Sequence, residues 1–338
     1  MSTAAQTPTK SSTLSLTGLR NLMRDKPIIP LLILLGVLVL VLEIGWGIVT
    51  KETGLLGLND RWIANIVKFA IPLAILAGAQ TLTMITGGID LSVGVVATMS
   101  AFVMATQVPT MDPIFAIPLA LVPAALAGLA SGIGVGIFRV HPLIMTLAVG
   151  LVAEGFLLVY QRTVLGTSAR VPEVLSWLGT GRSFGIPNAL LVFIPVALFI
   201  WYLTKRTGYG RTLYAIGDNE GAARLSGVRV PYVLILLYVI SALLAGVGGL
   251  VYVGLIKATT LSLAVPLMLP SVAAAVIGGT SIFGGRGGYA GTVVGALILG
   301  VLGTLLTLLK MPEGVRGMLF GGIILLVTAL YVRITREG

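Results

Sequence analysis

The sequence predicts an all-α polytopic membrane protein with about ten transmembrane helices. Of the 338 residues, 57% are hydrophobic and only 10% are charged, whereas a soluble domain has about 45–50% apolar and about 25% charged residues. The mean hydropathy is +1.04. Because a spanning helix needs about 20 apolar residues, a chain of this length has room for roughly ten crossings and little folded structure outside the bilayer.

Charge and cysteine content narrow the possible functions. The chain has no cysteine, which excludes disulfides, thiol catalysis and thiolate metal sites. In a soluble protein the net charge of +10 would suggest nucleic-acid binding, but in a membrane protein such an excess marks cytoplasmic loops. We therefore expect a chain surrounded by membrane lipid, with no nucleic-acid partner.

The first crossing follows a polar tail. Residues 1–27 are rich in Ser, Thr and basic residues and predict a disordered basic cytoplasmic tail. The apolar run Ile28–Val49 is longer than the apolar region of a signal peptide and lacks a small-residue cleavage site. We therefore expect it to be a retained spanning helix that opens a transmembrane domain over residues 28–332.

The remaining apolar blocks complete this domain. The block that begins at Leu91 is the shortest and follows a Gly-Gly break, so a partial crossing stays open there. The blocks after the first are Trp62–Thr86, Leu91–Gln107, Ile114–Phe138, Pro142–Tyr160, Pro187–Thr204, Pro231–Ile256, Pro266–Phe283, Tyr289–Leu309 and Val315–Val332.

The distribution of Lys and Arg predicts the orientation. If the N-terminus lies inside, the inner segments carry more basic residues than the outer ones, and the loop at about 205–230 contributes more of them than any other segment. The positive-inside rule then places both termini in the cytoplasm, including a short C-terminal tail at 333–338.

Glycines recur at helix-packing spacing. Gly128, Gly132 and Gly136 share one face of the fourth block, and Gly291 and Gly295 share one face of the ninth. Such faces allow close helix contacts in lipid. We expect packing within one chain, with a dedicated dimer face as the alternative.

Two absences limit the chemistry of the chain. It contains no G-x-x-x-x-G-K-[ST] phosphate loop, so we expect no ATP hydrolysis by the chain itself. The single histidine, His141, precedes Pro142 at the start of an apolar block, and we expect it to be a loop residue at the membrane interface. No cluster of catalytic side chains is visible, and we therefore predict no enzyme activity, catalytic residue, bound cofactor or metal in this chain.

The first informative motif lies at the junction of two apolar blocks. It begins with Gly87 and Gly88, which permit non-helical backbone, and continues with Asp90 and Ser92, either of which can cap the next helix. Irregular backbone at membrane depth occurs where it is buried in protein or lines a cavity. Asp90 can therefore be a helix cap, a substrate contact, or both.

A related motif begins at Gly278 and Gly279. Both stretches fit the pattern G-G-x-[DS]-[LI]-x-x-G and follow an apolar block. This match predicts diverged structural repeats around a common pathway.

The long loop at 205–230 carries charges of both signs. Its centre, from Gly217 to Val228, predicts one short amphipathic helix that ends at Gly227. This helix is either part of a solvated basic loop or a docking site for a cytoplasmic partner.

Together these motifs resemble the permease subunit of monosaccharide ABC importers of the ribose, xylose and galactose type. The resemblance rests on GGIDLSVG at 87–94, the pattern Ala-Ala-x-x-x-Gly at 222–227, and AVIGGTSIFGG at 275–285, in the family's order. It extends from about residue 60 to the C-terminus. The loop departs from that of other ABC importers, because Gly221 stands where their glutamate would be and Glu220 comes one residue earlier.

The resemblance implies a set of partners. It implies a second copy of the chain, an extracytoplasmic sugar-binding protein, and a cytoplasmic ATP-binding cassette subunit that holds ATP and Mg²⁺, all at the bacterial inner membrane. The cassette would dock on the 217–229 loop, where the candidate coupling residues are Asn219, Glu220, Ala222, Ala223, Arg224 and Gly227. Other members of this wider fold import branched-chain amino acids or nucleosides.

The sequence also suggests a pathway and two rival functions. Candidate pathway or helix-break residues are Gln80, Thr83, Gly87, Gly88, Asp90, Ser92, Gly278 and Gly279, with Thr81 and Ser100 as further lining groups; the polar ones can equally bond neighbouring helices. One rival is a proton-coupled secondary transporter that uses Asp90 and Glu154 as a relay. The other is a membrane scaffold without transport.

Overall fold

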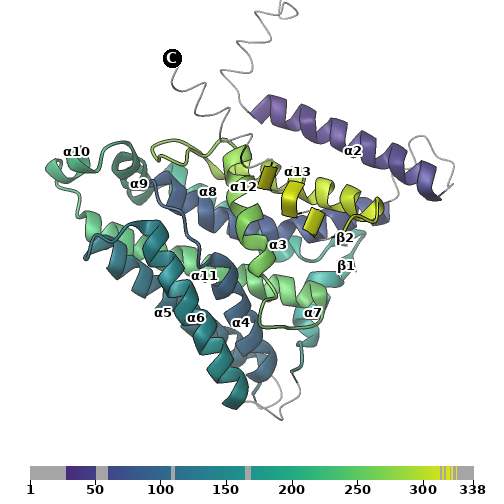
Figure 1. Cartoon of the computed structure of the whole chain (residues 1–338), viewed down its shortest axis with the longest axis horizontal. Coiled ribbons are helices and arrows are strands. Elements are labelled where there is room, and N and C mark those ends of the chain that lie inside the picture. Colours follow the sequence, from purple (N-terminus) through teal and green to yellow (C-terminus); the bar gives the residue numbers. More distant parts are fainter. Residues whose placement is uncertain are drawn as a thin grey trace, which may run out of the picture.

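The computed structural model describes residues 28–50, 60–107, 111–163 and 169–312, with 314–315, 317–319, 321–322 and 325. The expected tails at 1–27 and 333–338 and most of the expected block Val315–Val332 lie outside these residues. Figure 1 shows the fold, with α10 at the left edge of the molecule and the β1–β2 hairpin at the right.

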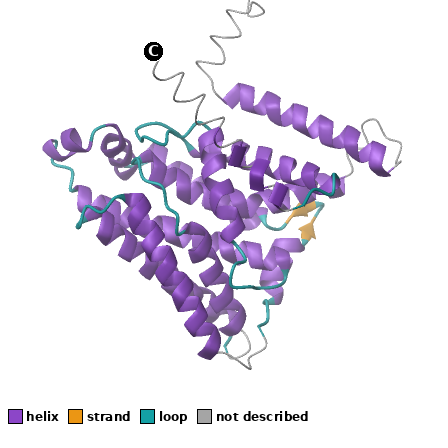
Figure 2. Ribbon diagram, viewed as in Figure 1, coloured by secondary structure: helices purple, strands orange, loops and turns teal. Residues whose placement is uncertain are grey.

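Helices make up almost all of the described structure, as the composition predicts (Figure 2). The one sheet in this part of the chain is a two-stranded antiparallel hairpin. In chain order the elements are α2 (Ile28–Thr50), α3 (Asp60–Ile85), α4 (Val93–Gln107), α5 (Pro113–Gly136), α6 (Pro142–Thr163), α7 (Glu173–Thr180), β1 (Arg182–Ser183), β2 (Ile186–Pro187), α8 (Leu190–Arg206), α9 (Gly208–Asp218), α10 (Glu220–Leu225), α11 (Val230–Ile256), η1 (Val265–Leu267), α12 (Met268–Ile277) and α13 (Tyr289–Leu308).

Helix α11 lies at the centre of the bundle and packs against α3, α4, α5 and α7. Small residues allow these close contacts. A Cβ atom added at Gly132 would lie 2.6 Å from the Cα of Ile235 on α11, and one added at Gly249 would lie 2.0 Å from the backbone oxygen of Ala97 on α4. The glycines on α5 therefore pack within the chain, as expected from their spacing.

The second glycine face also packs within the chain. A Cβ atom at Gly291 would lie 1.9 Å from the backbone oxygen of Gly278, and one at Gly295 would lie 2.2 Å from that of Ala274. Helix α13 is thereby held against α12, and its neighbour α2 packs on the outer side of α13 through Leu42 and Val301.

The number of crossings is smaller in the described residues than the ten expected. Three expected blocks form shorter apolar helices, namely Ile28–Ile44, Val93–Gln107 and Val265–Ile277. A sixth span is counted only if α8 and α9, which are bent by 69° at their junction, are taken together. The helices long and apolar enough to cross are Ile66–Ile85, Pro113–Gly136, Pro142–Thr163, Val230–Ile256 and Tyr289–Leu308.

The two Gly-Gly motifs end their helices in the same way, but in a register that differs from the sequence match. The left-handed residue is Gly87, the first glycine of its pair, with φ +79°, and Gly279, the second glycine of its pair, with φ +88°. In both, the next residue donates its N–H to a carbonyl five residues earlier, Gly88 to Thr83 and Thr280 to Ala275, which is the Schellman pattern. The helix ends therefore align one residue away from the sequence pattern.

The close contact between α4 and α11 gives a test of the fold. Gly249→Ala should lower the free energy of unfolding by about 1–3 kcal/mol, because its methyl group has to displace the Ala97 backbone. The matched control is Gly155→Ala on α6, where no atom lies within 4 Å of the added Cβ. Thermal unfolding in detergent should show a lower Tm for the first variant only, and equal Tm values would contradict this packing.

Candidate functional site

The break after α3 is held by hydrogen bonds to side chains of α3 itself and of α6. The side chain of Gln80 forms two hydrogen bonds with the backbone of Asp90. Its Nε2 donates to the backbone oxygen of Asp90 at 2.5 Å, and its Oε1 accepts from the Asp90 N–H at 3.2 Å. The hydroxyl of Thr146 on α6 accepts from the N–H of Leu91 at 3.0 Å. The irregular backbone is therefore paired inside the protein, as a non-helical segment at membrane depth requires.

The carboxylate of Asp90 is part of the same framework. Its Oδ1 accepts from the Ser92 N–H at 2.9 Å and from the Ser92 hydroxyl at 2.6 Å, and its Oδ2 accepts from Ser241 on α11 at 3.2 Å. Asp90 is 1% exposed. These bonds satisfy the carboxylate and fix the chain at the start of α4.

The other proposed lining groups are also buried in the single chain. The Thr81 hydroxyl lies 2.7 Å from that of Thr292 on α13, and Thr83 donates to the Gln80 oxygen in its own helix at 3.0 Å. Ser100 is buried without a hydrogen-bond partner among the described residues. Glu154, the second carboxylate of the suggested relay, lies on the exposed side of α6, far less buried than Asp90.

The loop after α8 contains two helices where the sequence suggested one. Helix α9 ends at Asp218, and Asn219 leaves the helical conformation with φ −156° and ψ 101°. Its side-chain oxygen accepts from the N–H of Ala222 at 3.0 Å, which caps α10. Gly227 has φ +87° and follows the end of α10. The cap at Asn219 is the physical reason for the division.

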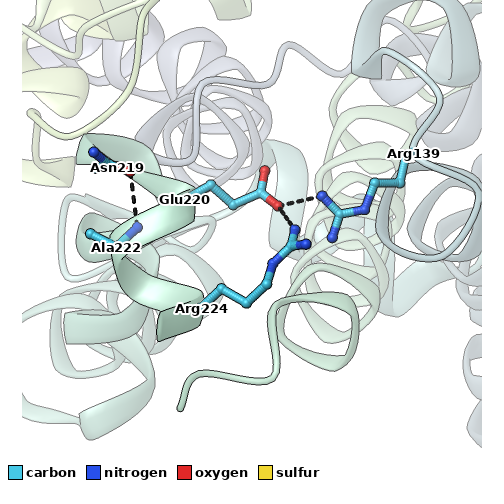
Figure 3. A network of polar contacts seen from close by, with 5 residues as sticks. All are labelled: Arg139, Asn219, Glu220, Ala222 and Arg224. Atoms are coloured by element: carbon cyan, nitrogen blue, oxygen red, sulfur yellow. Dashed lines mark hydrogen bonds and ion pairs between the residues drawn. The ribbon is translucent and has the colours of Figure 1, made fainter. Parts of the chain in front are cut away.

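An ion-pair network connects α10 to the turn between α5 and α6 (Figure 3). Oε1 of Glu220 accepts from Arg139 and from Arg224, each at 2.6 Å. Burial raises the pKa of Glu220, but the hydrogen bonds and charges of the two arginines lower it further, so the pKa lies below its ordinary value. Because these side chains are 40–53% exposed, the pairs orient α10 more than they stabilise the fold.

A glycine joint connects the same loop to both helix breaks. We define it as Ile85, Gly87, Gly217, Gly284 and Gly285. A Cβ atom at Gly217 would lie 1.9 Å from the oxygen of Ile85 and 2.6 Å from the nitrogen of Gly285; one at Gly284 would lie 2.8 Å from the Gly217 oxygen and 2.9 Å from the Gly87 nitrogen. The end of α9 thus touches the end of α3 and the loop after α12, backbone to backbone.

Hydrogen bonds hold this joint together. The N–H of Gly285 donates to the Ile85 oxygen at 2.9 Å, and the Tyr214 hydroxyl on α9 donates to the Gly287 oxygen at 2.9 Å. A further bond, from Tyr209 to the Val233 oxygen at 2.9 Å, fixes α9 to α11. The end of α9 is therefore in direct contact with the segments that follow both breaks.

A polar cavity of about 340 Å³ lies beside the joint. It is bounded by α10, the turn between α5 and α6, and α11, and His141 is in its wall rather than in a cluster of catalytic groups. Among its lining residues are Thr86, Gly87, Arg139, His141, Glu220 and Tyr238.

Sequence reasoning named some residues of the joint and of the ion-pair network but missed their partners. Gly87 in the joint and Glu220 in the network are among the candidates, whereas Gly284 and Arg139 were not singled out. A glycine inside a helix, such as Gly217 near the end of α9, costs about 1 kcal/mol relative to alanine. That cost was the available signal of a backbone contact, but it does not identify the contacting segment.

Comparison with known proteins identifies the family. A family profile described as the permease component of the branched-chain amino acid transport system matches residues 62–328. That match covers the helix breaks, the loop at 205–230 and the central bundle. The chain belongs to this family of transport permeases.

The relatives of this permease include named sugar transporters. The ribose import permease protein of Escherichia coli (strain K12) is 34% identical over 291 residues, which cover 85% of this chain and 87% of the relative. The galactofuranose transporter permease protein of the same strain is 33% identical, covering 84% and 82%, and the fructose import permease protein of Rhizobium meliloti is 33% identical, covering 76% and 73%.

These matches confirm the resemblance that the three motifs indicated, and the apolar helices show an integral membrane protein. No solved structure matches the chain significantly.

Proposed function

We propose that this permease forms the translocation pathway of an ABC importer for a monosaccharide. The observation that carries the proposal is the glycine joint, where the end of α9 contacts both helix breaks. A transport subunit without a phosphate loop needs an outside source of energy, and the joint gives a loop at one end of the bundle direct contact with breaks inside it.

The energy source in this proposal is a separate ATP-binding cassette subunit that holds ATP and Mg²⁺. Its docking surface is α10, with Glu220, Ala222, Arg224 and Gly227 around it, and Leu225 is 92% exposed at its end. Burial of this apolar side chain against the cassette would favour binding. The Arg139–Glu220–Arg224 network holds that surface in one orientation.

The transport mechanism we propose involves no covalent chemistry. Closure of the cassette pushes on α10, the cap at Asn219 transmits the displacement to α9, and Gly217 passes it to Gly87 and Gly284. The two breaks are the places where helix directions change. Gly88, Asp90, Ser92, Gly278 and Gly279 complete the breaks, and Gln80 and Thr83 hold them from α3.

The proposed assembly has a defined orientation. Ten crossings with both termini in the cytoplasm place α10 at the inner face of a bacterial inner membrane and the β1–β2 hairpin at the outer face. A second copy of the chain completes the pathway, and an extracytoplasmic binding protein delivers the sugar. Neutral sugars suit a pathway with few ionisable groups.

Uptake into vesicles separates this proposal from a proton-coupled transporter. The permease reconstituted with its cassette and binding protein should take up D-ribose or D-fructose only when ATP is supplied. Uptake by the purified chain alone, driven by an imposed pH gradient, would show secondary transport. Uptake of leucine but of neither sugar would favour an amino-acid permease of the same family.

The joint can be tested separately from the interface. Gly217→Ala should leave the protein in the membrane and bound to its cassette, yet lower ATP-driven uptake about 10-fold or more, because the methyl group separates α9 from Ile85. Gly208→Ala, at the start of the same helix, is the control, since the nearest atom to its added Cβ is 3.7 Å away on the Arg211 side chain. Full uptake by the Gly217 variant would contradict the proposed route of coupling.

A further inference from the structure

The segment between α11 and α12 leaves the helical conformation for Ala258–Ala264 and then forms the short η1 turn. Its far end is deep in the bundle. The N–H of Ala264 donates to the Thr98 hydroxyl on α4 at 2.9 Å, and a Cβ atom at Gly94 would lie 3.1 Å from the Ala264 oxygen. The segment therefore descends beside α4 toward the start of that helix.

Contacts between α4 and α11 indicate how deep Ala264 lies in the membrane. Ala97 on α4 touches Gly249, which precedes the end of α11 by about 10 Å at 1.5 Å per residue. Gly94, one turn earlier on α4, lies about 5 Å deeper. Because α11 is about 40 Å long and the hydrocarbon core is about 30 Å thick, Ala264 lies within the core even if α11 projects at both ends.

The side chains of this segment alternate. Leu261 packs with the cluster of Met99 and Phe102, and Leu263 packs with the cluster of Ala101 and Leu250. Thr260, which precedes Leu261, and Ser262, which lies between the two leucines, are exposed. The apolar side chains thus face the bundle and the hydroxyl groups face outward.

This polarity is the reverse of that on the lipid-facing helices. The outward side chains of α5 and α6 include Leu126, Ile144 and Val152, which are 60–73% exposed. In contact with lipid, a non-helical backbone with outward hydroxyls would leave polar groups unpaired, which is unfavourable in hydrocarbon. The outward face of the segment therefore requires polar surroundings.

The chemistry of the segment is suited to a neutral polyhydroxylated solute. Ser and Thr hydroxyls both donate and accept hydrogen bonds, as sugar hydroxyls do. Thr259 Oγ1 is buried and has no hydrogen-bond partner among the described residues, so a further unused hydroxyl lies at the base of the same segment. Unwound segments at membrane depth are where transporters bind substrates.

We propose that Thr260 and Ser262 line the translocation pathway and form hydrogen bonds with the passing sugar. This inference rests on the proposed importer function and deepens it, since it names the surface that the sugar contacts. It also assigns a purpose to the break between α11 and α12, because in a helix Thr260 and Ser262 would lie about 200° apart and could not face the pathway together.

The natural absence of cysteine allows a direct experiment on the full chain in membranes with its native partners. Thr260→Cys and Ser262→Cys, introduced singly, are exposed to a membrane-impermeant maleimide from the outer side, with and without D-ribose or D-fructose. Phe184→Cys, at the 103% exposed tip of the hairpin, is the control for accessibility, and Val152→Cys, 73% exposed on α6, is the control for a lipid-facing position.

The proposal predicts labelling at positions 260 and 262, slower labelling during sugar transport, and loss of ATP-driven uptake after modification. Position 152 should stay unlabelled, because a thiol in lipid does not ionise. Thr260→Ser, which keeps the hydroxyl, should transport normally, whereas Thr260→Val should raise the KM for the sugar more than it lowers the maximal rate.

Two results would overturn the inference. No labelling at 260 and 262 would show that the face meets lipid or a dry interface with a second copy, and labelling that neither responds to sugar nor affects uptake would show a water-filled surface outside the pathway. Failure of the proposed function is distinguishable, because unlabelled complexes would then show no ATP-driven uptake of either sugar, whatever the labelling pattern.

Discussion

A chain that leaves the helical conformation inside a bilayer must satisfy its own backbone polar groups, and the architecture of this permease depends on that requirement. The break after α3 meets it through Gln80, Asp90 and Thr146, and the break after α11 meets it in part through Thr98. Side chains from α3, α4 and α6 therefore act as substitutes for a missing helical ladder. Asp90 is explained by the same need, as a buried acceptor within the framework.

The breaks are also where the backbones of distant segments come together. Glycine at 217 and 284 removes the side chains that would separate α9 from Ile85 and Gly87, so that hydrogen-bonded backbone contacts take their place. Packed interiors deform little and shift between discrete arrangements. A loop that touches two breaks without intervening side chains is therefore well placed to change both together.

Much of the architecture could be predicted from the sequence, because the signals involved are local. Apolar length located α3, α5, α6, α11 and α13 to within a few residues, since lipid imposes a minimum length on each span. The spacing of Gly128 and Gly132 indicated close packing, which the contact with α11 confirms. The three motifs identified the family.

What could not be predicted depends on contacts between distant residues. The division of the coupling loop follows from the conformation of Asn219, and the shift between the two Gly-Gly motifs follows from which glycine adopts positive φ. Likewise Arg139 and Glu220 are 81 residues apart in sequence, and charge pattern alone does not pair them. The outward hydroxyl of Ser262 indicates a polar surrounding only when the depth of this residue in the membrane is known.

The central claim is that α9 and the two helix breaks move as one unit when the cassette closes. Spin labels at Ala215→Cys on α9 and Phe283→Cys beside Gly284, both exposed positions, measure it in the assembled transporter with and without a trapped nucleotide. The account predicts an unchanged distance between these two labels, together with a changed distance from Ala215→Cys to Val152→Cys on α6. A distance between positions 215 and 283 that changes with nucleotide would contradict it.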